Sequence, residues 1–165
     1  MGIATFERVY HLMSNITGVP FTNSTVAQVF QSSQQSMPSQ PQINAFLASH
    51  QTAVSQLAGA YCQQLVATPS AFSTFFGTNA SALSSNLGAS AGTYFGSSTN
   101  VANMVGPIVN NVVGPTAYPQ ASAAMTTELT ALVARIPTLN SSAKVSDVVT
   151  AACGAALGSA ATVVQ

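Results

Sequence analysis

The amino-acid sequence predicts an all-α protein, a single-domain bundle of six to seven helices over residues 1–165. Apolar residues recur at three- and four-residue spacing through most of the chain, which is typical of amphipathic helices. Signals for β-structure are weak, because no stretch alternates steadily and no Asn-Gly or Asp-Gly pair marks a hairpin. A chain of 165 residues is also long enough for one domain with a hydrophobic core.

The first third of the chain predicts two helices before a rigid connector. Over residues 3–14 the apolar side chains fall at helical spacing: Ile3, Phe6, Val9, Tyr10 and Met13. Gly18 and Pro20 end this helix, because glycine accepts a left-handed backbone and proline blocks continuation. Asn23 or Ser24 caps a second helix that runs to about residue 35.

The third helix, over about residues 39–66, is the clearest in the chain. Ser39 caps it, and Pro41 lies in its first turn, where proline is tolerated. Its apolar stripe is formed by Phe46, Leu47, Val54, Leu57, Tyr61 and Leu65. A short fourth helix over residues 71–76 supplies three core aromatics: Phe72, Phe75 and Phe76.

The middle of the chain, residues 77–118, predicts a long irregular insert. Residues 77–100 are dense in Gly, Ser, Asn and Thr and predict an ordered loop with room for one short helix near residues 81–87, whereas residues 101–113 are apolar. The pair Gly106-Pro107 and a second Gly-Pro pair just beyond predict that the apolar part is a broken helix. Since a long irregular loop is unusual in a compact domain, we expect residues 77–118 to form a contact surface.

Two helices complete the bundle. The first covers residues 120–135 and ends at Ile136-Pro137; its inward positions are Met125, Leu129, Leu132 and Val133. Ser142 caps the last helix, and Asp147 lies near its start, where a carboxylate interacts favourably with the helix dipole. This last helix is uncharged over residues 148–164, the lower length limit for a membrane span. Its bulk of Ala and Gly favours a central buried helix instead.

Scarcity of charge is the most unusual feature of the sequence. Charged residues make up 4% of the chain, against roughly 25% in ordinary soluble domains. The six are Glu7, Arg8, Glu128, Arg135, Lys144 and Asp147. Three cations cannot form the basic footprint that a nucleic-acid binder needs, so we expect no nucleic-acid partner. A surface of neutral hydroxyls and amides instead suits subunits that assemble, because no like-charge repulsion opposes their packing.

The two cysteines, Cys62 and Cys153, lie in the third and the last predicted helices. Neither belongs to a Cys-x-x-Cys motif, and an even number in an exported protein favours one disulfide. The alternative is a pair of free buried thiols, which behave as small hydrophobic side chains.

His11 and His50 are the two candidate ligands for a metal ion or haem iron. A zinc site needs three or four ligands, few carboxylates are available, and the Cys-x-x-Cys-His motif of c-type haem is absent. Ligation of a haem by both histidines stays open, but a structural role is the simpler interpretation. No Gly-x-Ser-x-Gly elbow occurs, and Cys62 lies more than three turns from His50. We therefore expect no enzyme and no cofactor.

Four Asn-x-Ser/Thr sequons occur, at Asn15, Asn23, Asn79 and Asn140. In a chain this rich in Asn, Ser and Thr, most such tripeptides arise by chance, and they matter only if the source is eukaryotic or otherwise glycosylates its proteins, so their use stays open. The chain opens without a basic segment followed by an apolar run. If the protein is exported, we therefore expect the sequence to be a mature form or an excised domain.

Several segments together resemble a helical domain near the C-terminus of bacterial laminin-G-like (LamG) surface proteins. They are Val19-Pro20 with the polar residues 31–35, residues 46–58 with Tyr61-Cys62, and residues 152–160. The resemblance covers residues 5–76 and 145–165, and the middle of the chain matches poorly. It implies export, the cysteine pair and an adhesive or structural setting, and it supplies no activity. The chain departs from it in lacking a lectin-like β-domain and in being poorer in charge.

These observations predict an exported bacterial structural protein, located outside the cell or at its surface. We expect a subunit that assembles with itself into an extracellular filament or surface layer. Residues 77–118 would form the contacts, and residues 1–20 would serve as an arm that reaches a neighbour. The alternatives are a non-catalytic accessory domain of a larger adhesin and a haem or metal carrier that uses His11 or His50.

Overall fold

The computed structural model describes residues 5–34, 48–114 and 118–159, and it confirms the all-α fold. These described residues form nine α-helices and one 3-10 helix, η1, and no strand. The elements are α1 (Phe6–Thr17), α2 (Ser24–Gln34), α3 (Ala48–Ala67), α4 (Pro69–Phe76), η1 (Gly77–Asn79), α5 (Ala80–Ser84), α6 (Ala91–Tyr94), α7 (Ser98–Val112), α8 (Pro119–Leu139) and α9 (Val145–Leu157). The number exceeds the six to seven expected, because the middle of the chain is more helical than predicted.

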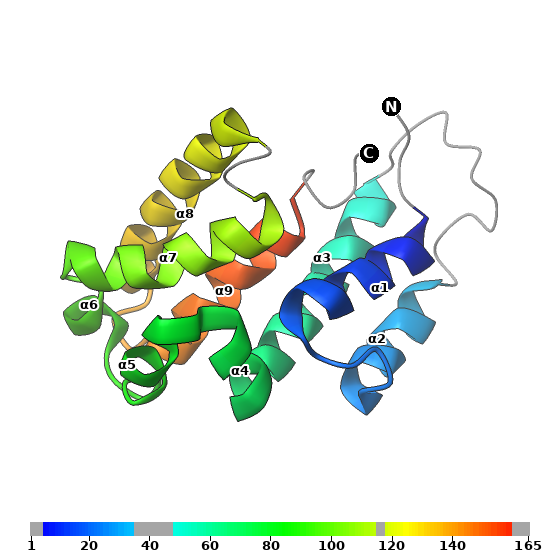
Figure 1. The fold of residues 1–165 in the computed structure, drawn as a ribbon, viewed down its shortest axis with the longest axis horizontal. Helices are drawn as coiled ribbons and strands as arrows, with labels where there is room; N and C mark the ends of the chain where they lie inside the picture. The colour runs from blue at the N-terminus through cyan, green and yellow to red at the C-terminus, as the bar shows by residue number, and fades with distance from the viewer. Residues whose placement is uncertain (1–4, 35–47, 115–117, 160–165) are drawn as a thin grey trace.

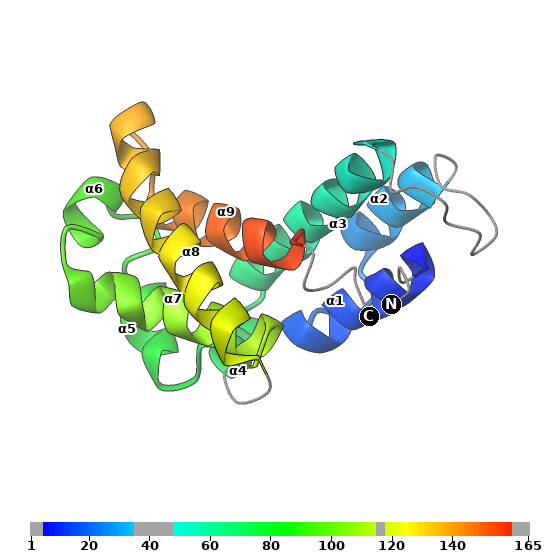
Figure 2. The same ribbon diagram turned by 90° about the horizontal axis from the view of Figure 1, so that it is seen from above.

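Helices α3 and α9 form the centre of the molecule (Figure 1). Helices α1 and α2 pack against α3 on one side. Helices α7 and α8 pack against each other and against α9 on the other side, as the view from above also shows (Figure 2). Helix α4 connects the two sides through contacts with α3 and α7.

The α3–α9 pair is held together by small residues and a disulfide. Cys62 and Cys153 are bonded, with their Cα atoms 5.8 Å apart, so the predicted disulfide is confirmed. A Cβ atom added at Gly154 would lie 3.9 Å from the Cα atom of Gly59, which shows how closely the two backbones approach. One turn further along, Gln51 Nε2 donates a hydrogen bond to the carbonyl oxygen of Gly158 at 2.9 Å. The predicted central, buried last helix is thus confirmed.

The N-terminal caps follow the sequence signals. Gly18 follows α1 with a left-handed φ of 70°, as glycine allows there. Asn23 caps α2, because its Oδ1 accepts hydrogen bonds from the backbone N–H groups of Thr25 and Val26. Its Nδ2 donates to Gln64 Oε1 at 3.1 Å, which links this turn to α3. The predicted cap of the third helix at residues 39–41 lies outside the described residues.

The middle of the chain, residues 77–118, is more helical than predicted. A short helix was expected near residues 81–87, and α5 lies there, but η1 and α6 were not expected. The predicted break at Gly106-Pro107 is wrong, because α7 continues through this pair. Glycine before proline removes the Cβ atom that would clash with the ring, so the helical backbone is tolerated. Packing also stabilises the helix at this point, since the residues around the proline are buried: Met104, Val105, Ile108 and Val109.

The N-cap of α9 lies two residues after the predicted one, Ser142. Ser142 donates its N–H and its hydroxyl to Asn140 Oδ1, at 3.1 and 2.7 Å, and so belongs to the preceding turn. The helix is capped at Lys144, whose N–H donates to Asp147 Oδ2 at 2.9 Å. Helix α8 likewise runs past its predicted end, with Pro137 inside its last turn. Both errors shift a boundary without changing the number of helices in this region.

Substitutions at Gly154 test the close approach of α3 and α9. We expect Gly154→Leu to lower the free energy of unfolding by about 1–3 kcal/mol, because a large side chain forces the two backbones apart. Gly154→Ala should be neutral or stabilising, since its Cβ meets Gly59 at an ordinary contact distance and alanine favours the helix. Urea unfolding of both variants measures the difference. Equal stability of the two variants would contradict close packing at this point.

Removal of the disulfide tests its contribution to stability. The bond spans 91 positions, for which loop-closure entropy gives about 4–5 kcal/mol. We expect the double variant Cys62→Ala/Cys153→Ala to lose a comparable free energy of unfolding, measured with urea. Wild-type protein unfolded in the presence of dithiothreitol provides the control. An unfolding free energy that does not respond to reduction would show that the bond contributes little.

Candidate functional site

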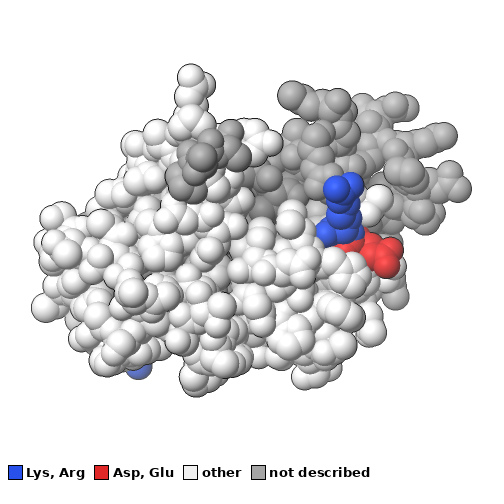
Figure 3. Space-filling model, in the orientation of Figure 1, with Lys and Arg blue, Asp and Glu red and all other residues white. Residues whose placement is uncertain are grey.

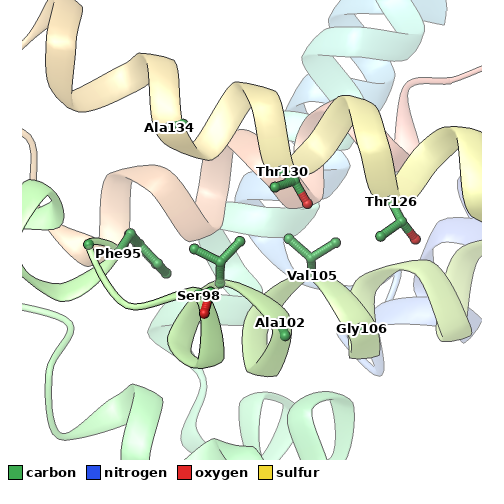
Figure 4. Close-up of a pocket in the computed structure, with 10 residues that line it drawn as sticks. Phe95, Ser98, Ala102, Val105, Gly106, Thr126, Thr130 and Ala134 are labelled. Carbon is green, nitrogen blue, oxygen red and sulfur yellow. The ribbon is translucent and has the colours of Figure 1, made fainter.

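An apolar groove of about 430 Å³ runs between α7 and α8 (Figure 4). Its residues are Phe95, Gly96, Ser98, Val101, Ala102, Val105, Gly106, Thr126, Thr130 and Ala134. We call this feature the α7–α8 groove. Each helix contributes residues four positions apart, and such residues share one face of a helix. The two faces therefore act as the opposite walls of one groove.

The chemistry of the groove is that of a binding surface. None of its ten residues ionises near neutral pH, so the walls supply no general acid or base. The Thr126 hydroxyl already donates to the carbonyl oxygen of Ser122 at 2.8 Å. Figure 4 shows the side chains of Thr126 and Thr130 directed toward α7. The groove can thus accept an apolar group and orient it with a few neutral hydroxyls.

Seven of the ten groove residues lie within residues 77–118, the segment predicted to form contacts. The other three, Thr126, Thr130 and Ala134, were not predicted as site residues, because polar and small residues on one face of a helix usually indicate a face exposed to solvent. Their spacing of four positions was the available signal. It becomes informative only when a second helix is known to lie opposite.

The surface of the molecule carries few charges. All six charged side chains are exposed, and two of them, Glu128 and Arg135, lie on α8 beside the groove. Figure 3 shows one face of the molecule that is nearly free of charged side chains. Three large apolar side chains also stand exposed: Phe21 at 45%, Tyr118 at 65% and Leu139 at 74%.

The two histidines have different environments. His11 is exposed on α1, where its ring lies 4.8 Å from that of Phe21 in an edge-to-face contact. His50 is buried near the start of α3. Within the described ranges, no group of three or more His, Cys, Asp or Glu side chains comes together, and both cysteines are bonded to each other. These residues therefore provide no multi-ligand metal site. No helix in the described part of the chain has the length and hydropathy needed to cross a membrane.

Aromatic side chains attach the N-terminal helices to α3. Tyr10 stacks on Phe30 with ring centres 4.1 Å apart, and Phe30 stacks on Phe6 at 5.2 Å. Tyr61 of α3 is completely buried and donates its hydroxyl to the carbonyl oxygen of Tyr10 at 2.9 Å. The Tyr10 hydroxyl donates in turn to the carbonyl oxygen of Phe21. The predicted arm was residues 1–20, of which residues 1–4 lie outside the described residues; one face of residues 5–20 packs on its own chain.

Comparisons of the chain with protein-family models, with curated proteins and with solved structures find no match. The features that bear on function are therefore the composition, the disulfide, the α7–α8 groove and the sparsely charged surface.

The aromatic cluster predicts a loss of stability in alkali. Burial, together with the Tyr10 hydroxyl nearby, raises the pKa of Tyr61 well above its ordinary value of 10. A raised pKa means that the fold favours neutral tyrosine. Its contribution is fully present below pH 10 and is lost as the pH rises above that value. We expect the free energy of unfolding, measured by urea titration, to fall above pH 10.

The variant Tyr61→Phe is the matched test of that cause. It should cost about 1 kcal/mol at neutral pH, because the bond to the Tyr10 carbonyl is lost. It should also flatten the decline in stability above pH 10. If Tyr61→Phe declined as steeply as wild type, ionisation of another group would be responsible.

Proposed function

We propose that the chain is an exported bacterial structural protein, a non-catalytic subunit that assembles with itself into an extracellular filament or surface layer. The observation that carries this proposal is the nearly uncharged surface with an apolar groove in it. A protein with few charges and no net charge lacks the repulsion that keeps most soluble proteins apart. Copies of this chain can therefore approach one another at little electrostatic cost.

The α7–α8 groove supplies a defined place for contact between copies. It is apolar and lies away from the exposed apolar side chain of Phe21, which belongs to the turn between α1 and α2. A groove on one part of a subunit and an apolar projection on another part favour head-to-tail association, which builds filaments when the contact does not close into a ring. The Phe21 ring contacts the rings of His11 and Tyr10, with ring centres 4.8 and 6.2 Å away, so little order has to be imposed on this side chain when it binds.

The disulfide supports location outside the cytosol. Disulfides persist mainly in exported proteins, because cytosolic thiols are kept reduced. Cys62 and Cys153 account for every cysteine in the sequence, so no thiol is left for chemistry or for a metal ion. Oxidation of the whole cysteine content fits a structural role in an oxidising setting.

The resemblance to LamG surface proteins favours a second candidate, an accessory domain of a larger adhesin. A sugar-binding module encoded upstream in the same reading frame would support that candidate. A haem or metal carrier using His11 or His50 is the third candidate. An absorbance spectrum of native protein without a Soret band, together with metal-free elemental analysis, would eliminate it.

A charge placed in the α7–α8 groove tests the assembly directly. We expect wild-type protein to form oligomers whose size grows with concentration in light scattering and electron microscopy. Ala102→Arg should raise the dissociation constant more than tenfold, because association would bury an unpaired charge. Ala151→Arg, at an exposed position of α9 outside the groove, is the matched control and should assemble as wild type does.

The salt dependence provides an independent check. Because few charges are present to be screened, sodium chloride should change the association only slightly. Thermal unfolding of both arginine variants verifies that neither has lost its fold. A strictly monomeric wild-type protein at high concentration, in low and in high salt, would overturn the proposed assembly.

A further inference from the structure

We propose that Asn140 is an acceptor for an N-linked glycan, and that the fold presents this sequon while blocking the other three. The inference rests on the proposed export, because N-glycosylation takes place outside the cytosolic compartment. Four sequons are present in the sequence, at Asn15, Asn23, Asn79 and Asn140. Sequence alone gives no reason to choose among them, but the conformation of each sequon separates one from the rest.

A sequon works through two side chains, the asparagine and the hydroxyl residue two positions later. In a helix, side chains two positions apart do not face each other, so a helical sequon cannot present both to one enzyme. Asn15 lies inside α1, and its partner Thr17 is buried with its hydroxyl bonded to the carbonyl oxygen of Met13 at 2.7 Å. Asn79 has a helical backbone, with φ −85° and ψ −12°, where η1 passes into α5. Neither sequon can therefore present its two side chains to a glycosyltransferase in the folded chain.

The sequon at Asn23 is unavailable for glycosylation for a different reason. Its Oδ1 caps α2, and its Nδ2, the atom that would carry the glycan, donates to Gln64 Oε1. Modification would break the link from this turn to α3. The folded chain consequently holds this nitrogen in a structural bond.

The sequon at Asn140 is exposed and is not helical. Asn140 is exposed and follows the end of α8 with an extended backbone, φ −138° and ψ 95°. The Ser142 hydroxyl donates to Asn140 Oδ1 at 2.7 Å, so the two functional side chains lie together on the outside of the turn. The side-chain hydrogen bonds at Asn140 are accepted by its oxygen Oδ1, from the N–H and the hydroxyl of Ser142, whereas at Asn23 the nitrogen Nδ2 is held in a bond to Gln64. This arrangement presents both sequon groups at once.

The surroundings give such a glycan a physical role. The neighbouring Leu139 is the most exposed of the three large apolar side chains, at 74%. Figure 2 shows the last turn of α8 projecting from the body of the molecule. A glycan at Asn140 would cover Leu139 and hydrate a surface that carries almost no charge. It would also keep the α8–α9 turn out of contacts between subunits.

The transfer needs a lipid-linked oligosaccharide and an oligosaccharyltransferase. Asn140 Nδ2 forms a bond to the anomeric carbon of the sugar, and the bond from that carbon to the phosphate oxygen of the polyprenyl diphosphate breaks. The diphosphate leaves with the electron pair, and Nδ2 releases one proton. No oxidant or reductant takes part.

The test offers the folded, disulfide-bonded chain to a transferase that accepts folded substrates, with a lipid-linked donor, and locates the glycan by mass spectrometry. We expect one glycan, at Asn140. Asn140→Gln and Ser142→Ala should each abolish it, whereas Ser142→Thr and the matched control Asn79→Gln should leave it unchanged. The reduced and unfolded chain should accept glycans at further sequons.

Two results would overturn the inference. One is a folded chain that stays unmodified while the unfolded chain is accepted at Asn140. The other is a folded chain modified at Asn15, Asn23 or Asn79 as readily as at Asn140. Thermal unfolding of the two variants that should lose the glycan verifies that they are folded. Because the measurement does not depend on assembly, failure of the proposed filament and failure of this inference are distinguishable.

Discussion

The close antiparallel contact between α3 and α9 is the constraint on which the rest of the structure depends. Gly59 and Gly154 let the two backbones approach, and the bond between Cys62 and Cys153 fixes the pair at one point. Small residues alone would gain little buried apolar area, since each removes few atoms from water. The disulfide compensates by restricting the unfolded chain over 91 positions. A domain without charge networks thus obtains part of its stability from a covalent bond.

The two sides of the molecule use this central pair differently. On one side, aromatic rings of α1 and α2 close over Tyr61, which is buried and hydrogen-bonded. On the other side, α8 buries few of its residues, and a groove is left between it and α7. A peripheral helix with a narrow buried face is suited to gain a further partner, because much of its apolar and neutral surface is still in contact with water. The groove therefore follows from how sparsely α8 is packed.

Local signals in the sequence predicted the parts of the fold that local chemistry determines. The cap at Asn23, the glycine end of α1 and the three phenylalanines of α4 depend on a few neighbouring residues, and each is confirmed. The middle of the chain could not be predicted in this way. Gly106-Pro107 is a local signal to stop a helix, but packing around it outweighs the one hydrogen bond that proline removes. The groove residues on α8 could not be predicted for the same reason, since only tertiary packing places α8 opposite α7.

The scarcity of charge that would favour the proposed assembly would also require that some surfaces be kept out of it. With few charged residues to prevent wrong contacts, such a subunit would need other means of directing them. The exposed turn at Asn140 lies beside the most exposed apolar side chain, Leu139, where an unspecific contact would otherwise form most easily. A glycan there would exclude neighbours by its volume and leave the α7–α8 groove as the preferred place of association. Steric exclusion would then take the role that charge repulsion has on ordinary protein surfaces.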